Sequence, residues 1–320
     1  MVCECTLASF GYGAIAWLLY RLATCVFAII YPFFVGEKKD LHALAAGADW
    51  AVVTGSTDGI GKGYAKQLAK EGFNVLLVSR TPEKLQAVKE ELQKLYPKVT
   101  FDTFAFNFLT GSREDYQPLI EKLEGLKVGV LINNVGMSFK HPDAMHELGI
   151  PILGDITVVN SLPPVVLTAA VLPQMTARKG GIVVNISSVS AYNAWYYWTA
   201  YSATKRFVLH LTSILRQEYA SKGITFQAVA PGLVSTNMTS KFTEGFFVPG
   251  PDTFATSAVR SIGIVGETTG FYAHQIEKEI LMSIPEFIRE KLLTRLSHTL
   301  KARYHWAMEL RAKEAKAKAQ

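Results

Sequence analysis

The stretch Trp50-Ala-Val-Val-Thr54-Gly55-Ser56-Thr57-Asp58-Gly59-Ile60-Gly61 decides the fold. Its first five residues have the apolar, β-branched composition of a buried strand, and the glycine-rich turn after them opens a helical pattern. Glycines at 55, 59 and 61 let the backbone turn tightly and approach a pyrophosphate, whose charge the N-terminus of the helix then meets. A glycine trio alone is weak evidence. Between a strand and a helix it indicates a dinucleotide site, made by Gly55, Ser56, Asp58, Gly59, Ile60 and Gly61.

From Trp50 onward the chain alternates short β-branched runs with helical patterns, which is typical of parallel β-α-β units. Right-handed connections then predict an α/β domain of Rossmann type. It is a doubly wound parallel sheet of about seven strands, with its ligand crevice at the carboxyl ends of the strands. The expected strands lie near residues 50–54, 74–79, 99–106, 128–133, 181–187, 225–230 and 270–275, and the expected helices near 60–71, 83–96, 112–123, 155–178 and 201–221.

The second expected strand ends in Ser79-Arg80, where an NAD-preferring enzyme would place an acidic residue to hold the ribose hydroxyls. A guanidinium at this point can bind a 2′-phosphate through two hydrogen bonds. We therefore expect NADP(H) as the cofactor, with Lys62 and Ser56 able to assist Arg80. The alternative is that Arg80 is an ordinary surface arginine.

The sequence Tyr201-Ser-Ala-Thr-Lys205 places a phenol and an ammonium group four residues apart at the start of a helix, so that both project from one face. We expect Lys205 to lower the pKa of the Tyr201 phenol from about 10, making it a usable acid for a carbonyl oxygen. Ser188 follows the preceding strand, and its hydroxyl can hold the same oxygen as negative charge develops on it. The spacing of Tyr201 and Lys205 is common by chance, so the serine and the glycine turn are needed to support this interpretation.

Together these residues resemble the short-chain dehydrogenase/reductase family, from about Trp50 to at least Thr236. The resemblance implies that Tyr201 is the proton donor, that Ser188 orients the substrate, and that Lys205 binds the nicotinamide ribose and tunes the tyrosine. It also implies that Asn160 is the family's helix asparagine, which supports a proton-relay water.

Three further segments relate to the family's cofactor site. Asn133-Asn134-Val135-Gly136 is similar to its Asn-Asn-Ala-Gly segment, with valine replacing alanine, which implies that Asn133 lines the adenosine side. Pro231-Gly232 through Thr236 matches the Pro-Gly-x-Val-x-Thr segment next to the nicotinamide amide. Asn107 departs from the pattern, because the family usually has an aspartate there in contact with adenine. An amide can still hydrogen-bond adenine, so we expect weaker discrimination rather than loss of binding.

Longer strings narrow the resemblance further. They look like the branch that contains 17β-hydroxysteroid dehydrogenase type 12, the very-long-chain 3-oxoacyl-CoA reductases and related steroid dehydrogenases. The strings are AVVTGSTDGIGKGYAKQLAKEGFNVLLVSR, VLINNVGMSF, and YSATK followed by EYASKGITFQ. This resemblance implies an endoplasmic-reticulum membrane enzyme of fatty-acid elongation or steroid metabolism, with its catalytic domain facing the cytosol.

Residues 1–46 are expected to form a hydrophobic membrane-anchor segment. A nearly continuous apolar run from Leu7 to Val35 is long enough to cross a bilayer. Arg21 interrupts it at a cost of about 3 kcal/mol on insertion scales, so a tilted, interfacial or hairpin arrangement stays open. We expect an anchor rather than a signal peptide, because no basic residue precedes Arg21. The alternative is a helix packed on the domain or on a dimer partner.

The expected catalytic domain, residues 47–285, is followed by a basic C-terminal helix and tail, residues 286–320. From Arg289 onward there are nine lysines and arginines against three glutamates. No base-reading module accompanies them, so we expect an anionic membrane surface as the partner and no nucleic acid. Lys316 and Lys318 resemble a dilysine retrieval signal of the endoplasmic reticulum. All three cysteines precede residue 47, which suits a reducing compartment.

No metal site is expected, because the seven histidines show no His-Glu-x-x-His or other metal spacing, and His141 and His146 fall in an expected surface loop.

Taken together, these features predict an NADPH-dependent oxidoreductase that reduces the ketone of a lipid-like substrate to a secondary alcohol. A catalytically silent scaffold that binds lipid or a partner is the alternative, although such a protein would be expected to lose Tyr201 or Lys205. The choice between acyl-CoA and sterol stays open, as does the oligomeric state. A homodimer is one possibility, since dimers are frequent in the resembled family.

Overall fold

Within residues 4–239 and 242–318, which the computed structural model describes, seven parallel strands form one sheet in the order β3-β2-β1-β4-β5-β6-β7. The chain starts the sheet at its centre with β1, builds outward on one side, and then returns to the other side with β4. The strands are β1 Trp50–Thr54, β2 Asn74–Ser79, β3 Phe101–Ala105, β4 Val128–Asn133, β5 Gly181–Ile186, β6 Ile224–Val229 and β7 Glu267–Thr268. The order therefore reverses between β1 and β4, where a doubly wound sheet opens a ligand crevice.

The register brings the carboxyl ends of the central strands to one edge. Thr54 at the end of β1 pairs with Val78 of β2, and Asn133 at the end of β4 pairs with Asn185 of β5. The central strands are buried on both faces, which explains their nearly continuous apolar runs. The segments that follow these strands, including the glycine turn, consequently meet at the same edge.

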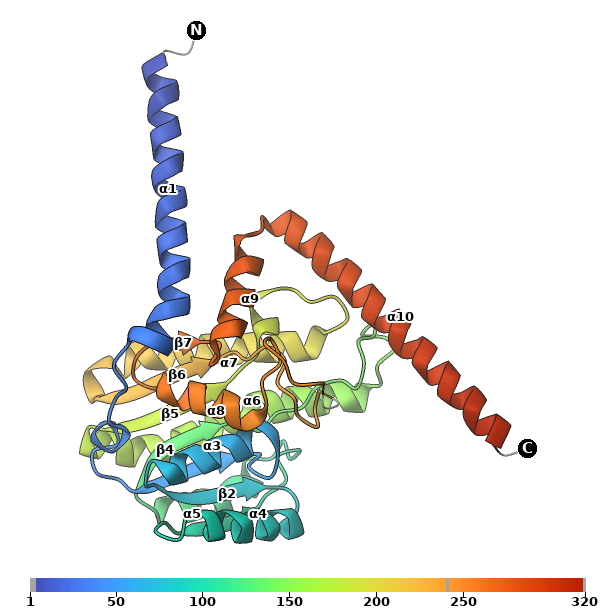
Figure 1. Cartoon of the computed structure of the whole chain (residues 1–320). Coiled ribbons are helices and arrows are strands. Elements are labelled where there is room, and N and C mark those ends of the chain that lie inside the picture. The colour runs from blue at the N-terminus through green and yellow to red at the C-terminus, as the bar shows by residue number, and fades with distance from the viewer. Residues whose placement is uncertain (1–3, 240–241, 319–320) are drawn as a thin grey trace.

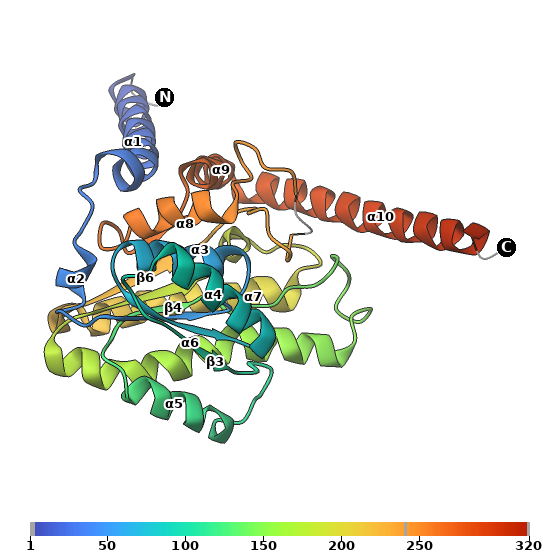
Figure 2. The same ribbon diagram turned by 60° about the horizontal axis from the view of Figure 1, so that its bottom comes forward.

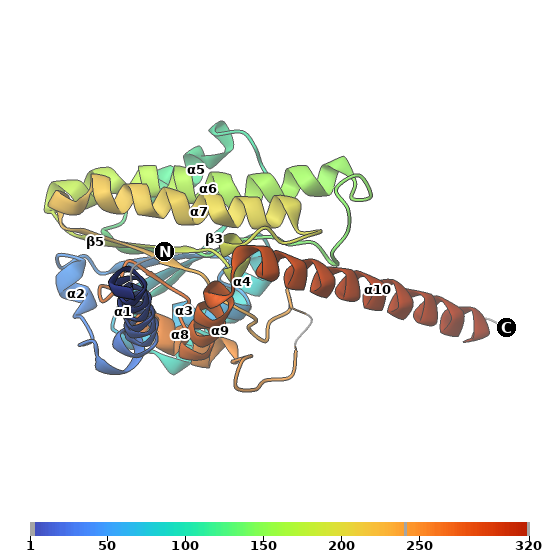
Figure 3. The same ribbon diagram turned by 90° about the horizontal axis from the view of Figure 1, so that it is seen from above.

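Helices cover both faces of the sheet, as Figure 3 shows from above. On one face lie α5 Gln117–Glu124, α6 Ile150–Arg178 and α7 Thr199–Glu218. On the other lie α3 Gly59–Lys70, α4 Pro82–Leu95 and α8 Pro251–Arg260. Each face has its own apolar core, one around Leu77 and Phe254 and one around Leu131 and Phe226. Two packed cores fix the strand ends that carry the site.

Three segments extend this frame. Helix α1, Glu4–Ile30, continues through a π-helical turn, Tyr31–Val35, and projects away from the sheet, with α2 Leu41–Leu44 leading into β1 (Figures 1 and 2). At the other end, α9 Tyr272–Ser283 is followed by the long α10 Glu286–Lys318, which runs diagonally past the domain. Cys3 lies outside the described residues, as do the side chains of Cys5, Lys316 and Lys318.

The fold agrees with the doubly wound parallel sheet expected from the sequence, with one strand misplaced. Residues 270–275 were expected as the last strand, whereas β7 covers only Glu267–Thr268 and Tyr272 begins α9. Gly270 adopts a left-handed φ of +78° between the two elements and ends the extended backbone. A short apolar, aromatic run fits strand and helix equally well, so its period did not separate them. Helix α8 was not expected at all.

Candidate active site

The glycine turn between β1 and α3 has left-handed backbone that favours glycine. Gly55 and Gly59 have φ values of +63° and +53°. A Cβ atom on Gly61 would lie 2.3 Å from the carbonyl oxygen of Gly55, so a side chain there would fill the turn. Asp58 is the N-cap of α3 and accepts a hydrogen bond from the Asn237 amide at 2.5 Å instead of capping the helix. The first amides of α3 are thus left for an external acceptor.

Thr54 and Asn134 join the ends of β1 and β4 at the point where the strand order reverses. The Thr54 hydroxyl accepts hydrogen bonds from the backbone N–H groups of Asn134 and Val135, at 2.9 and 3.0 Å. The Asn134 side chain donates to the carbonyl oxygens of Thr54 and Gly55, at 2.8 and 3.3 Å. The crevice therefore has a rigid floor.

A cavity of about 250 Å³ opens above this floor and joins the glycine turn to the expected chemical groups. Nine of the residues expected at the site line it: Gly55, Asp58, Gly59, Ile60, Ser188, Tyr201, Lys205, Pro231 and Thr236. The glycine turn and Tyr201 therefore line the same space.

Tyr201, Ser188 and Lys205 come together from the end of β5 and the start of α7. Tyr201 lies in the first turn of α7, close enough to Ser188 for the serine hydroxyl to lower the pKa of the phenol. The Ser188 hydroxyl also accepts from the Ser190 N–H at 3.2 Å, which holds it at the start of a 3₁₀ turn. One turn of α7 further on, the Lys205 ammonium lies 5.9 Å from the centre of the Tyr201 ring. Two hydroxyl groups thus converge on one point of the cavity.

Burial sets the pKa values of these groups. It lowers the pKa of Lys205 to about 8, because enclosure disfavours the charged ammonium. The ammonium donates a hydrogen bond to the Ile186 carbonyl oxygen at 3.1 Å. Burial raises the pKa of the Tyr201 phenol, and the Ser188 hydroxyl offsets only part of this rise. We expected Lys205 to lower the pKa of Tyr201, and this is wrong for the protein without cofactor: the pKa is raised, and Ser188 is the residue that opposes the rise. A phenol that keeps its proton at neutral pH is suited to donating it.

Asn160 lies beside the cavity, on α6. Its side-chain oxygen accepts from the Met137 N–H at 2.8 Å, and its amide donates to the Met137 carbonyl at 3.0 Å and to the Thr204 hydroxyl at 3.1 Å. A Cβ atom on Gly136 would lie 3.1 Å from the Lys205 nitrogen and 3.3 Å from the Asn160 side-chain oxygen. Asn160 and Lys205 thus lie next to Gly136, which lines the cavity together with Ser188 and Tyr201.

Asn133 takes a different place from the one expected. Its side chain is buried beneath the cavity and donates to Asn185 at 2.8 Å and to the Thr168 hydroxyl at 3.2 Å. It joins β4, β5 and α6, which corrects the expectation that it lines the adenosine side. Asn134, one residue later, lines the cavity instead.

The residues expected near the adenosine end lie beyond the cavity wall. Arg80 follows β2 and is exposed, and among the described side chains it has no ion-pair partner. Asn107 is also exposed, after β3, and its side-chain oxygen accepts from the Leu109 N–H at 3.3 Å. Lys62 forms an ion pair with Glu91 at 2.6 Å, while the buried Ser56 hydroxyl donates to the Val78 carbonyl at 3.4 Å. Arg80 is therefore the free cation of this group.

The segment after β6 closes the cavity opposite the glycine turn. A Cβ atom on Gly59 would lie 2.9 Å from a methyl carbon of Thr236, so the Thr236 side chain packs directly against the Gly59 backbone. The Nε2 atom of buried His274, on α9, lies 3.0 and 3.2 Å from the carbonyl oxygens of Leu233 and Phe247. Asn134, Gly136, Met137 and His274 were not singled out from the sequence. For Asn134 and Gly136 the Asn-Asn-Val-Gly segment was the one sequence feature that could have pointed to them.

The sequence pattern of the family described as short chain dehydrogenase matches residues 49–245, more than half of the chain. The chain belongs to the short-chain dehydrogenase family. The family and fold expected from the sequence are thereby confirmed.

Relatives of this short-chain dehydrogenase include the very-long-chain 3-oxoacyl-CoA reductase of Caenorhabditis briggsae, 45% identical over 100% of both chains. The human very-long-chain 3-oxoacyl-CoA reductase is 36% identical, over 92% of this chain and 93% of its own. Among solved structures, a short-chain dehydrogenase from Sphingobium yanoikuyae in complex with NADPH is 27% identical, with a TM-score of 0.60. The matched region covers 66% of this chain and 83% of the Sphingobium yanoikuyae chain.

Two helices of this short-chain dehydrogenase are long and apolar enough to cross a membrane, judged by length and composition within the described residues. The first, Ser9–Val35, is only 11% buried, and Figure 1 shows it standing clear of the domain. The second, α6, packs on the sheet and is half buried. The first is thus the candidate for the expected anchor, whereas α6 is a core helix.

Proposed function

We propose that this chain is an NADPH-dependent reductase that converts the ketone of a lipid substrate to a secondary alcohol. One observation carries the proposal: Tyr201 and Ser188 line the same cavity as the glycine turn. A dinucleotide fits the residues present, because the turn leaves no room for side chains at Gly55 and Gly61 and Lys205 offers a buried cation beside it.

The chemistry divides between cofactor and protein. When bound, NADPH supplies a hydride to the carbonyl carbon. Tyr201 gives its proton to the carbonyl oxygen, while the Ser188 hydroxyl hydrogen-bonds the same oxygen and stabilises its developing charge. Among the described residues the Lys205 ammonium donates to one acceptor, the Ile186 carbonyl, so its other hydrogens can hold the ribose hydroxyls. Arg80, free at the end of β2, would bind the 2′-phosphate.

A long-chain 3-oxoacyl-CoA is the substrate that we favour. Two nematode relatives that align over the full length of both chains, at 45% and 46% identity, carry the name very-long-chain 3-oxoacyl-CoA reductase. A ketosteroid is the second candidate, because a Caenorhabditis elegans relative 42% identical over 91% of this chain is named as a steroid dehydrogenase. Both substrates present an apolar body and a ketone, which the same catalytic groups can serve.

The placement that we propose is the endoplasmic-reticulum membrane, with the catalytic domain facing the cytosol. Residues 1–46 would anchor the chain, residues 47–285 would catalyse, and residues 286–320 would lie near the anionic lipid surface. The exposed apolar surface of α1 supports this arrangement, since isolated apolar helices are costly to leave in water. We also expect a homodimer, which light scattering of the detergent-solubilised protein would test.

The test is NADPH oxidation by the full-length protein in detergent, offered a long-chain 3-oxoacyl-CoA or a 17-ketosteroid. Tyr201→Phe should lower kcat by about 100-fold or more while NADPH binding persists, because only the proton donor is removed. Tyr196→Phe, which changes an exposed tyrosine nearby, is the matched control. Equal rates for wild type and Tyr201→Phe would remove the phenol from its role. A folded, NADPH-saturated protein that turns over neither ketone would favour the silent scaffold.

A further inference from the structure

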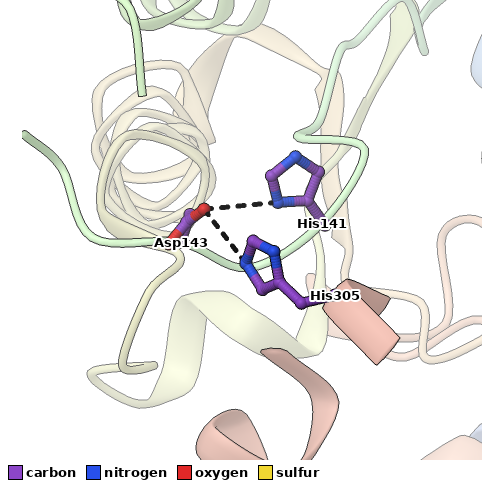
Figure 4. Close-up of side chains that lie close together, drawn as sticks. All are labelled: His141, Asp143 and His305. Carbon is purple, nitrogen blue, oxygen red and sulfur yellow. Dashed lines mark ion pairs between the residues drawn. The ribbon is translucent and has the colours of Figure 1, made fainter. Parts of the chain in front are cut away.

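Two histidines and an aspartate from distant parts of the chain meet where the loop between β4 and α6 touches α10. His141 and Asp143 lie in the loop, and His305 lies on α10 (Figure 4). One ligand-type atom from each side chain lies within 4.8 Å of the other two. No metal site was expected from the sequence, because the histidines show no metal-ligand spacing and His141 falls in an expected surface loop.

The two carboxylate–imidazole distances in this cluster are close to those between neighbouring ligands of one metal ion, and longer than those of charge-assisted hydrogen bonds. The Asp143 Oδ2 atom lies 3.6 Å from the Nδ1 atom of His141 and 3.5 Å from the Nε2 atom of His305. Charge-assisted hydrogen bonds would be shorter, at about 2.7–2.9 Å. Ligands bound to one tetrahedral ion at 2.0–2.1 Å are separated by about 3.4 Å. The buried Nδ1 atom of His141 also has no hydrogen-bond partner.

Neighbouring groups hold these side chains in place. The ring of His141 stacks on Tyr304 of α10, with ring centres 4.0 Å apart and planes 16° from parallel. The Lys301 ammonium contacts the other oxygen of Asp143, Oδ1, and also Glu147. Lys301 and His305 are one turn apart on the same face of α10. The lysine thus leaves Oδ2 directed at the two histidines, and it opposes a cation only from the far side of the carboxylate.

We propose that His141 Nδ1, Asp143 Oδ2 and His305 Nε2 bind a divalent cation of the zinc class. Two imidazoles and one carboxylate are a donor set that zinc accepts with a fourth position left for water. His305 is half exposed, so its ring can move to close the widest separation in the cluster. The site is independent of the proposed reductase chemistry.

Such an ion would fasten α10 to the loop that leaves the active site. That loop begins at Gly136 and Met137, whose backbone Asn160 holds, and it reaches α10 about five residues later. Figure 1 shows this green loop extending from the body to the red helix. Bound metal would restrict both segments and stabilise the folded chain by mass action.

The experiment uses the full-length protein in detergent, purified without a histidine tag and stripped with a chelator. Zn²⁺ alone is titrated by calorimetry, and Co²⁺ alone is added as a spectroscopic probe. We expect one Zn²⁺ per chain, a visible tetrahedral Co²⁺ band, and a higher Tm with Zn²⁺. His305→Gln and His141→Gln should each weaken Zn²⁺ binding by at least about 10-fold, as loss of groups that merely support ligands already does.

His146→Gln is the matched control, because it changes an exposed histidine of the same loop. Binding retained by His146→Gln and lost by the other two variants supports the site. Wild-type protein that binds no Zn²⁺ beyond the level of the His141→Gln/His305→Gln double variant overturns it. A Co²⁺ complex with only octahedral, weakly coloured bands in wild type would contradict the tetrahedral donor set.

Discussion

The side chain of Asn160 encloses the backbone of Met137, accepting from its N–H at 2.8 Å and donating to its C=O at 3.0 Å. With a further bond to Thr204, both N–H donors of the side chain are used within the protein, and its oxygen already accepts one bond. The main-chain carbonyl of Asn160 receives no hydrogen bond from the helix backbone. The two residues that could donate to it within α6, Pro163 and Pro164, lack an N–H. A water held by Asn160 would therefore bind this carbonyl rather than the side chain.

Replacing Pro164 by alanine restores an N–H that can satisfy the Asn160 carbonyl within the helix. We expect Pro164→Ala to fold at least as stably as wild type and to lower kcat by about 10- to 100-fold, as loss of a proton relay would. Pro173→Ala, in the same helix but exposed, is the control. Rates are compared at saturating NADPH, and equal kcat for the two variants would show that the carbonyl has no part in proton transfer.

The depressed pKa of Lys205 predicts a pH limit for cofactor binding. Burial lowers this pKa to about 8, so the ammonium is charged below that pH and neutral above it. If the charge holds the cofactor, kcat/KM for NADPH should fall as the pH rises through about 8, and Lys205→Met should remove the transition. The measurement is a pH profile from about 6 to 10. An affinity that stays level across that range would exclude a role for the charge.

Cofactor choice should depend on Arg80. Arg80→Asp removes the guanidinium and places a carboxylate where ribose hydroxyls would be held, so KM should rise about 10- to 100-fold for NADPH and fall for NADH. Arg113→Asp serves as the control, since Arg113 is an exposed arginine whose ion pair with Glu114 lies at the surface. An unchanged NADPH:NADH ratio in Arg80→Asp would mean that Arg80 is only a surface residue.

The glycine turn can be tested with two glycines that differ in surroundings. An alanine Cβ at Gly61 would meet the Gly55 carbonyl oxygen at 2.3 Å, whereas at Gly111 it would meet nothing within 4 Å. Gly61→Ala should cost about 1–3 kcal/mol of unfolding free energy and weaken NADPH binding, while Gly111→Ala should change stability by less than about 0.5 kcal/mol. Denaturant unfolding with and without NADPH measures both effects. Equal behaviour of the two variants would contradict the close approach.

Local patterns predicted the glycine turn and the pair Tyr201 and Lys205, because one turn or one helix face determines each. They could not show whether Asn133 or Asn134 lines the cavity. Neighbouring side chains at a strand end point to opposite sides of the sheet, and which one faces the cavity depends on the strand register. The last strand was misplaced, because Gly270 interrupts an aromatic run that suits either period. His305 could not be linked to His141 from the sequence, as only the path of α10 brings them together.

His274 shows how a buried histidine couples the cavity to pH. Its ring is fully enclosed, and burial lowers its pKa to about 4, although its bonds to Leu233 and Phe247 favour the charged form. In the unfolded chain this pKa returns to about 6.5, so the unfolded state takes up a proton that the folded state refuses. The free energy of unfolding is therefore undiminished above about pH 6.5 and falls as the pH drops toward about 4. The loss reaches about 3 kcal/mol as an order of magnitude.

His274→Gln can keep a donor for the two carbonyl oxygens yet does not titrate, so its unfolding free energy should fall less than that of wild type between about pH 7 and 4.5. Denaturant unfolding at several pH values measures the difference, and His210→Gln, at an exposed position, controls for the loss of any histidine. If wild type and His274→Gln lost stability in parallel on acidification, protonation of this ring could not be what loosens the segment over the cavity.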